Sequence, residues 1–282
     1  MMNEFRKRGT ATILAIFSAL AFVGVLVTNG LANALPLNGA NTGVLSDEIP
    51  NLFVPAGLTF SIWGLIYLLL AGYIVAVLAE AGRTAKDGHS DDGSAWGPAD
   101  AALFLLNAAV NIGWIFAWHW RRVGLAMFLM LVILGTLIAL EAGSQSKLSR
   151  GGALDKDRVR GWARRFFLTV PLRVYLGWIS VATIANATAV LVKAGWSGFG
   201  LDPRFWTVFV IAAGLAVALG FSLLKRQIAA PLVIVWAYAG IVIKRLETDT
   251  SYSSPVWIAA AVASFIILAS LAPGLLRRRE TR

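Results

Sequence analysis

Eight long apolar segments, separated by short stretches rich in polar and charged residues, dominate the hydropathy pattern of the chain. The apolar positions within each segment are continuous rather than alternating, which favours helices over barrel strands, since such strands cross a membrane with only about 9–11 residues. A helix needs roughly 20 apolar residues to cross a hydrocarbon core about 30 Å thick. The sequence therefore predicts eight transmembrane helices, at Ala11–Ala34, Gly57–Ala79, Ala101–Trp118, Val123–Leu140, Phe166–Val192, Phe205–Leu224, Ile228–Ile243 and Val256–Leu275.

Composition agrees with this pattern and excludes several classes of protein. Of the 282 residues, 58% are apolar and 14% are charged, whereas a soluble globular domain carries about 25% charged residues. Disorder is excluded because it requires low hydrophobicity. The chain has no cysteine, and its two histidines, His89 and His119, are far apart in the sequence, so neither a thiolate site nor a histidine pair for a metal is indicated. We expect an all-α membrane protein with no metal site and no required cofactor.

Lysine and arginine residues are distributed unevenly between alternate loops. With the N-terminus in the cytoplasm, the stretches on that side hold 18 of them and those on the opposite side hold six. This asymmetry matches the positive-inside rule and predicts a bacterial inner-membrane protein with both termini in the cytoplasm. The net charge of +10 then reflects orientation in the membrane, so we expect lipid rather than nucleic acid as a partner. The basic stretch 141–165 either sets this topology or also contacts anionic lipid.

The predicted outer segment Leu35–Val54 differs from the other loops. It has no lysine or arginine, and its polar residues are interleaved with Leu, Val, Ile and Phe. Its length far exceeds the few residues, roughly 2–8, that two neighbouring helices need. We expect it to fold over the helices as a lid, the alternative being an ordinary ordered connector. The stretch 81–99, rich in Gly, Asp and Ser, is typical of a flexible linker.

Three predicted helices carry stripes of aromatic and amide side chains at helical spacing. Tryptophan normally collects at the membrane interface, but Trp63, Trp114 and Trp178 lie well inside their apolar segments. Polar groups at that depth tend to face the interior of a bundle or a cavity. The stripes comprise Phe60, Trp63 and Tyr67; Asn107, Asn111, Trp114 and Trp118; and Tyr175, Trp178, Ala182 and Asn186.

Two interpretations of these stripes are open. If they converge, they line a pocket suited to a flat apolar molecule with a few polar edges. Alternatively, the amide and indole N–H groups hydrogen-bond between helices and hold the bundle together. Arg173, which lies about two turns inside the predicted fifth helix, is a separate case. Its side chain either extends to the cytoplasmic surface or pairs with Glu80 or Glu141.

At the stripes the sequence resembles the TspO/MBR family of tryptophan-rich sensory proteins, which are related to the mitochondrial translocator protein. The stretch FVPAGLTFSIWGLIY (Phe53–Tyr67) is similar to the family's aromatic-Pro-Pro…Phe…Val-Trp-x-x-x-Tyr motif, with Pro55-Ala56 in place of the Pro-Pro pair. Asn111-Ile112-Gly113-Trp114, followed by Arg121-Arg122-Val123-Gly124, resembles N-x-x-W…R-R-x-G. Tyr175-Leu176-Gly177-Trp178, then Ala182-Thr183 and Asn186, resembles Y-L-x-W…A-T…L-N.

The resemblance covers about residues 8–195 and implies a five-helix bundle with a pocket beneath the first outer loop. That pocket would take tetrapyrroles or other flat lipophiles, with Trp63 and Trp178 as the central ring contacts and Asn111, Trp114 and Ala182 beside them. We accordingly divide the chain into a TspO-like ligand-binding bundle, residues 1–195, and a three-helix membrane extension, residues 196–282.

From these observations we expect non-catalytic binding of a hydrophobic small molecule, with a tetrapyrrole such as a porphyrin as the first candidate, in a sensory or carrier role. A transporter or permease, an enzyme that modifies a pigment or lipid, and a membrane anchor are the alternatives. The stripes offer few titratable groups for catalysis, and a homodimer is an open alternative to a monomer. The predicted ligand-binding residues are Phe60, Trp63, Tyr67, Asn111, Trp114, Trp118, Tyr175, Trp178, Ala182 and Asn186.

Overall fold

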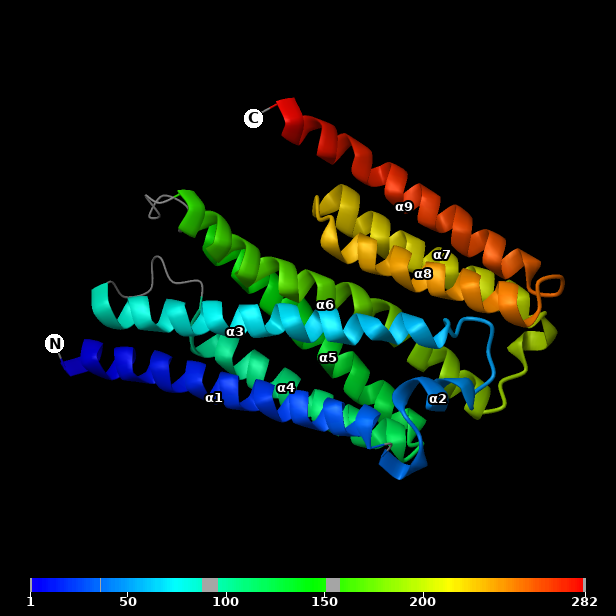
Figure 1. Cartoon of the computed structure of the whole chain (residues 1–282), viewed down its shortest axis with the longest axis horizontal. Helices are drawn as coiled ribbons and strands as arrows, with labels where there is room; N and C mark the ends of the chain where they lie inside the picture. Colours follow the sequence, from blue (N-terminus) through cyan, green and yellow to red (C-terminus); the bar gives the residue numbers. More distant parts are fainter. Residues whose placement is uncertain (1, 36, 88–95, 151–157, 281–282) are drawn as a thin grey trace.

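A computed structural model describes residues 2–35, 37–87, 96–150 and 158–280, and these residues form helices and connecting turns without strands. Eight long helices run roughly parallel or antiparallel to one another, and the first turn of α1 and the last turn of α9 lie at the same end of the molecule (Figure 1). The long helices are α1 (Met2–Ala34), α3 (Ile62–Asp87), α4 (Pro98–His119), α5 (Val123–Arg150), α6 (Arg158–Lys193), α7 (Pro203–Leu219), α8 (Ala229–Thr248) and α9 (Ser254–Glu280). The short elements are η1 (Leu37–Gly39), α2 (Thr42–Asp47), η2 (Gly57–Ser61), η3 (Gly198–Gly200) and the π-helical turn η4 (Gly220–Leu224).

The eight predicted spans are confirmed as helices that are long and apolar enough to cross a membrane, and the all-α membrane fold is correct. Most of the long helices extend beyond their predicted spans; in particular, α3 continues to Asp87, α5 continues to Arg150 and α6 begins at Arg158. The flexible linker and basic loop expected at 81–99 and 141–165 are therefore partly helical. The remaining parts of these loops, 88–95 and 151–157, lie outside the described residues.

The first five long helices form a closed ring. Helix α1 packs against α3 and α4, α5 lies between α4 and α6, and α6 returns to α3. The ring interior is filled by aliphatic side chains, of which Ile66, Ile115, Ile133 and Leu172 are at most 1% exposed. This arrangement matches the five-helix bundle that the resemblance implies.

The C-terminal helices pack onto the bundle through α8. Gly177 of α6 permits a close approach, because a Cβ atom at this position would lie 2.7 Å from the carbonyl oxygen of Ala230. Small residues at such contacts let membrane helices pack closely. Helix α8 also contacts η2, where the Trp236 indole N–H donates to the carbonyl oxygen of Thr59 at 2.9 Å. Helices α7 and α9 complete a second group of three helices around α8.

Residues 37–54, which we call the α2 segment, lie over the end of the bundle opposite the chain termini (Figure 1). Asn38 donates through its amide to the carbonyl oxygen of His119 at 2.8 Å. The Arg121 guanidinium forms two hydrogen bonds of 2.8 Å with the Glu48 carboxylate. Leu45 and Phe53 of this segment are buried in the hydrophobic core. The segment thus covers the bundle in the position predicted for a lid, and we call this end of the molecule the α2 end.

Candidate functional site

The stripes of α3 and α6 meet in a cluster of aromatic rings. The Trp63 ring stacks on Tyr67 with centroids 5.5 Å apart, and it meets the rings of Tyr175 and Trp178 edge to face at 5.9 and 6.1 Å. Phe60 from η2 contacts Trp178 at 5.8 Å. The α6 rings are buried and the η2 and α3 rings are half-buried. The packing of the two stripes therefore follows the prediction that they face each other.

The α4 stripe joins the same cluster through hydrogen bonds. The Asn111 amide donates to the Tyr175 hydroxyl at 2.7 Å, and the Trp114 indole donates to the Asn186 amide oxygen at 3.3 Å. Asn186 in turn donates to the carbonyl oxygen of Ala182 at 2.9 Å. The ten predicted ligand-binding residues lie on η2, α3, α4 and α6, and side-chain contacts connect these elements. We call this set, Phe60, Trp63, Tyr67, Asn111, Trp114, Trp118, Tyr175, Trp178, Ala182 and Asn186, the aromatic cluster.

Further hydrogen bonds of the α4 stripe connect it to other parts of the fold. The Trp118 indole donates to the carbonyl oxygen of Thr42 at 3.3 Å and so connects α4 to the α2 segment. The Asn107 amide donates to the Thr136 hydroxyl of α5 at 2.8 Å, which fits the alternative in which stripe residues hold helices together. Sequence reasoning missed Asn29 of α1, which is buried and donates to the Asn111 amide oxygen at 3.0 Å. The sequence signal that could have identified Asn29 is its amide side chain inside the first predicted apolar segment.

Two donors of the aromatic cluster have no partner. The Tyr67 hydroxyl and the Trp178 indole nitrogen are buried and form no hydrogen bond in the part of the chain that the structure describes. Such atoms are uncommon, since most buried polar groups are satisfied. The cavity that Tyr67 lines together with Asn111 and Tyr175 measures about 10 Å³, which is at most the space of one water molecule. The rings therefore fill the space between the helices in this conformation.

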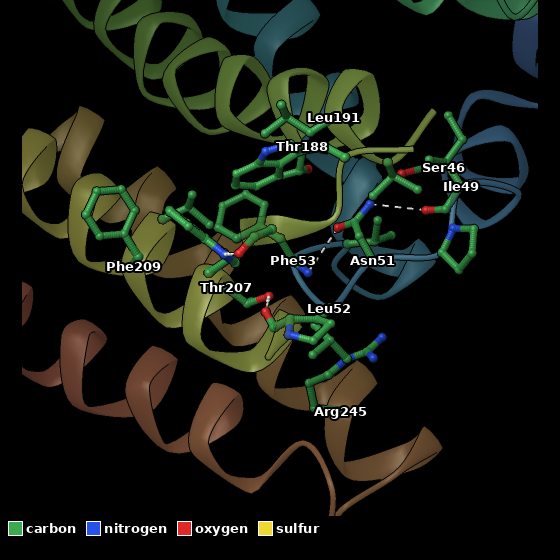
Figure 2. Close-up of a pocket in the computed structure, with 18 of the residues that line it drawn as sticks. Ser46, Ile49, Asn51, Leu52, Phe53, Thr188, Leu191, Thr207, Phe209 and Arg245 are labelled. Carbon is green, nitrogen blue, oxygen red and sulfur yellow. Dashed lines mark hydrogen bonds between the residues drawn. The ribbon is translucent and has the colours of Figure 1, made fainter. Parts of the chain in front are cut away.

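A larger cavity, of about 770 Å³, lies at the α2 end between residues 46–54, the end of α6, the start of α7 and the end of α8 (Figure 2). We call it the α7–α8 cavity. Phe53, Trp196, Trp206 and Phe209 supply aromatic rings to its lining, and Arg245 supplies a guanidinium. Its volume falls within the range of about 300–1,000 Å³ that is typical of ligand pockets. Sequence reasoning missed this cavity entirely.

Helix α6 separates the aromatic cluster from the α7–α8 cavity. Asn186 accepts a hydrogen bond from Trp114 of the cluster, whereas Thr188 and Leu191 line the cavity. Residues two positions apart on an α-helix point to nearly opposite sides, so Asn186 and Thr188 present different faces. One helix therefore contributes a wall to both sites.

Charged residues of the membrane helices are paired near the end that holds the chain termini. The Arg173 guanidinium donates to the Glu141 carboxylate at 2.9 Å, and the Gln227 amide donates to the same oxygen at 2.9 Å. Arg173 therefore adopts the paired alternative, with its side chain 20% exposed. Glu80, the other candidate partner, binds Arg164 through two hydrogen bonds of 2.7 Å.

The described residues contain no group of three or more His, Cys, Asp or Glu side chains placed to hold a metal ion. His119 is fully buried at the end of α4, where its Nδ1 atom lies 2.8 Å from the carbonyl oxygen of Ile115.

The fold and its aromatic cluster define a multi-pass α-helical membrane protein. A family model described as "TSPO-like protein" matches residues 15–272, and the chain belongs to this family. The match extends past residue 195, so it includes the C-terminal helices that we place outside the resemblance on sequence alone. No curated protein and no solved structure matches the chain.

Proposed function

We propose that this protein binds a flat hydrophobic molecule at the aromatic cluster, with a tetrapyrrole as the first candidate. The observation that carries this proposal is the pair of unsatisfied donors there. The Tyr67 hydroxyl and the Trp178 indole belong to different helices, yet both are buried without a hydrogen-bond partner. A ligand with polar edges would supply acceptors to both groups, while its flat face would lie against the rings.

Binding at this site requires the rings to separate. The adjoining cavity of about 10 Å³ holds no organic molecule, so the α3 and α6 rings must move apart to admit one. Phe60, Trp63 and Tyr67 are half-buried, so the α3 side of the cluster has less packing to disrupt than the α6 side. The ligand would therefore enter along the contact between α3 and α6.

The role that we propose is binding in a sensor or carrier rather than catalysis. Tyr67 and Tyr175 are the only titratable members of the aromatic cluster. General acid–base chemistry near neutral pH uses groups whose pKa lies near the operating pH, and a tyrosine hydroxyl has an ordinary pKa of about 10. The cluster offers shape, apolar surface and hydrogen bonds, which are the requirements of a binding protein.

Titration of the full-length protein in detergent with protoporphyrin IX tests this proposal. Binding is followed by the shift of the porphyrin Soret absorption band, so that the loss of a tryptophan does not change the signal itself. We expect saturable binding that weakens at least tenfold in the double variant Trp63→Ala/Trp178→Ala. The matched control is Trp162→Ala, which removes a tryptophan that is 65% exposed and should leave the affinity unchanged. Unsaturable binding, or equal affinity in the double variant and the control, would overturn the proposal.

A further inference from the structure

The α7–α8 cavity combines an aromatic lining with a buried cation. The Trp196 and Trp206 rings lie 4.8 Å apart, and Phe209 continues this apolar surface at 5.8 Å from Trp206. The Trp206 indole is anchored by a 2.9 Å hydrogen bond to the carbonyl oxygen of Gly198, whose left-handed φ of 64° favours glycine. This wall is therefore held in place by its own contacts.

Arg245 of α8 lines the cavity on the side facing residues 46–54, and Figure 2 shows its side chain extending towards Leu52. The residue is 8% exposed, and its Nε atom is buried without a hydrogen-bond partner. An arginine in such a place is costly unless its charge is matched. The guanidinium thus has N–H donors available for an anionic group of a ligand.

Neighbouring carboxylates are engaged elsewhere. Asp47, which also lines the cavity, pairs with Lys244, and Asp249 accepts a 3.1 Å hydrogen bond from the backbone N–H of Tyr252. Neither forms an ion pair with Arg245 among the residues that the structure describes. The cavity lining holds Lys244, Arg245 and one carboxylate, so the lining residues carry a net charge of +1.

We propose that the α7–α8 cavity binds an amphiphile whose anionic head group pairs with Arg245 and whose apolar body lies against Trp196, Trp206 and Phe209. Guanidinium binds carboxylate and phosphate groups through two parallel hydrogen bonds, and an apolar lining accommodates a hydrocarbon chain. A fatty acid and an anionic phospholipid share this head-group chemistry. The site lies on the opposite side of α6 from the aromatic cluster, so the inference does not depend on the function proposed for that cluster.

The test uses the full-length protein in nanodiscs of phosphatidylcholine, which has no net charge. Radiolabelled oleate is the first probe, and oleyl alcohol is its uncharged counterpart. Phosphatidylglycerol, included in the nanodisc at increasing fractions, is the phospholipid probe. We expect saturable oleate binding, at least tenfold weaker binding of oleyl alcohol, and competition by phosphatidylglycerol if the natural ligand is a phospholipid.

Substitutions assign the binding to this cavity. Arg245→Gln should weaken oleate binding at least tenfold, and Arg245→Lys should restore part of the affinity because it keeps the charge. Thr188→Trp should fill the cavity and weaken oleate and oleyl alcohol alike. The control Arg122→Gln removes an exposed arginine at the same end, outside the cavity lining, and should change nothing.

Several outcomes separate this site from the aromatic cluster. Oleate binding that persists in Trp63→Ala/Trp178→Ala and falls in Arg245→Gln supports the inference, whatever the porphyrin result. Saturable binding of phosphatidylglycerol that falls in Arg245→Gln, in the absence of oleate binding, supports it with a phospholipid as the source of the head group. Absence of binding by both anionic probes, or oleate affinity in Arg245→Gln within twofold of the unaltered protein, overturns it. Retention of the unaltered protein's unfolding temperature by Arg245→Gln excludes misfolding as the cause of a loss.

Discussion

The side-chain amide of Asn111 donates a 2.7 Å hydrogen bond to the hydroxyl of Tyr175 and thereby joins α4 to α6. Asn29 of α1 donates to the same Asn111 side chain at 3.0 Å. Three helices of the ring are therefore connected through one amide, which is 1% exposed. Interhelical hydrogen bonds of this kind stabilise membrane proteins by about 0.6 kcal/mol on average, and Asn111 forms two of them.

Replacement of Asn111 by leucine should lower the free energy of unfolding by about 1–2 kcal/mol, because two interhelical hydrogen bonds are lost and Asn29 and Tyr175 remain buried. Reversible unfolding in mixed detergent micelles measures this change. The matched control is Asn33→Leu, since the Asn33 amide bonds only to the carbonyl oxygen of Asn29 on its own helix. Equal losses in the two variants would show that the bonds between helices contribute nothing.

Gly177 should be intolerant of even a methyl group. An added Cβ would lie 2.7 Å from the Ala230 carbonyl oxygen and 2.9 Å from its Cα atom, so α6 and α8 would have to separate. Overpacking of this kind costs about 1–3 kcal/mol. Thermal unfolding of Gly177→Ala should show the loss, whereas Gly135→Ala, with nothing within 4 Å of the new atom, should be neutral or stabilising. An unchanged unfolding temperature for Gly177→Ala would contradict the close packing of these helices.

The pair formed by Arg173 and Glu141 should behave as a buried ion pair. The Glu141 side chain is 8% exposed, so Arg173→Met leaves a buried carboxylate without its cation and should destabilise the protein by about 3 kcal/mol. Arg173→Met/Glu141→Gln should be more stable than the single variant, because a neutral amide oxygen can still accept from Gln227. A double-mutant cycle measures the coupling, and strict additivity of the two changes would refute it.

The contact between Glu48 and Arg121 should make the α2 segment sensitive to acid. The hydrogen bonds from Arg121, together with its charge, lower the pKa of Glu48 from its ordinary value of 4.5. A carboxyl group whose pKa is lowered by folding stabilises the folded form above its ordinary pKa, and this contribution is lost as the pH falls through the lowered value. Hydrogen exchange of the amides of residues 42–48 should therefore accelerate, relative to a chemical-exchange reference, below about pH 4.5.

Glu48→Gln should abolish most of this acid response and give faster exchange at neutral pH. Asp202→Asn serves as the control, because the pKa of Asp202 is also lowered, through hydrogen bonds from Arg204, but the residue lies outside the α2 segment. An acid response of residues 42–48 that persists in Glu48→Gln would assign it to other groups.

The positions of the helices and of their aromatic faces could be predicted because both follow from local patterns. Continuous apolar runs define the spans, and the spacing of Trp63 and Tyr67 on one helix places them on one face, as do Tyr175 and Trp178 on another. The ends of α3 and α5 could not be predicted from hydropathy, because a helix can continue through polar residues beyond the membrane.

The α7–α8 cavity could not be predicted because its lining comes from segments with no shared local pattern. Residues 46–54 reach it from a loop, Thr188 from α6 and Trp206 from α7, and only the packed structure brings them together. Arg245 follows the predicted helix Ile228–Ile243 and so belongs to the six basic residues predicted on the outer side, but in the structure it lies within α8 and is buried. From the sequence alone, an arginine that only sets membrane orientation cannot be distinguished from one that lines a cavity between three helices and a loop.

Helix α6 forms one side of the aromatic cluster and one wall of the α7–α8 cavity. Because α6 is continuous from Tyr175 to Leu191, a sideways displacement of the helix that widens the space at the aromatic cluster would narrow the α7–α8 cavity. If both proposed sites bind their ligands, any factor by which one ligand changes the affinity for the other must equal the factor by which the second changes the affinity for the first. On the two binding proposals made above, one helix would therefore couple the two ligands.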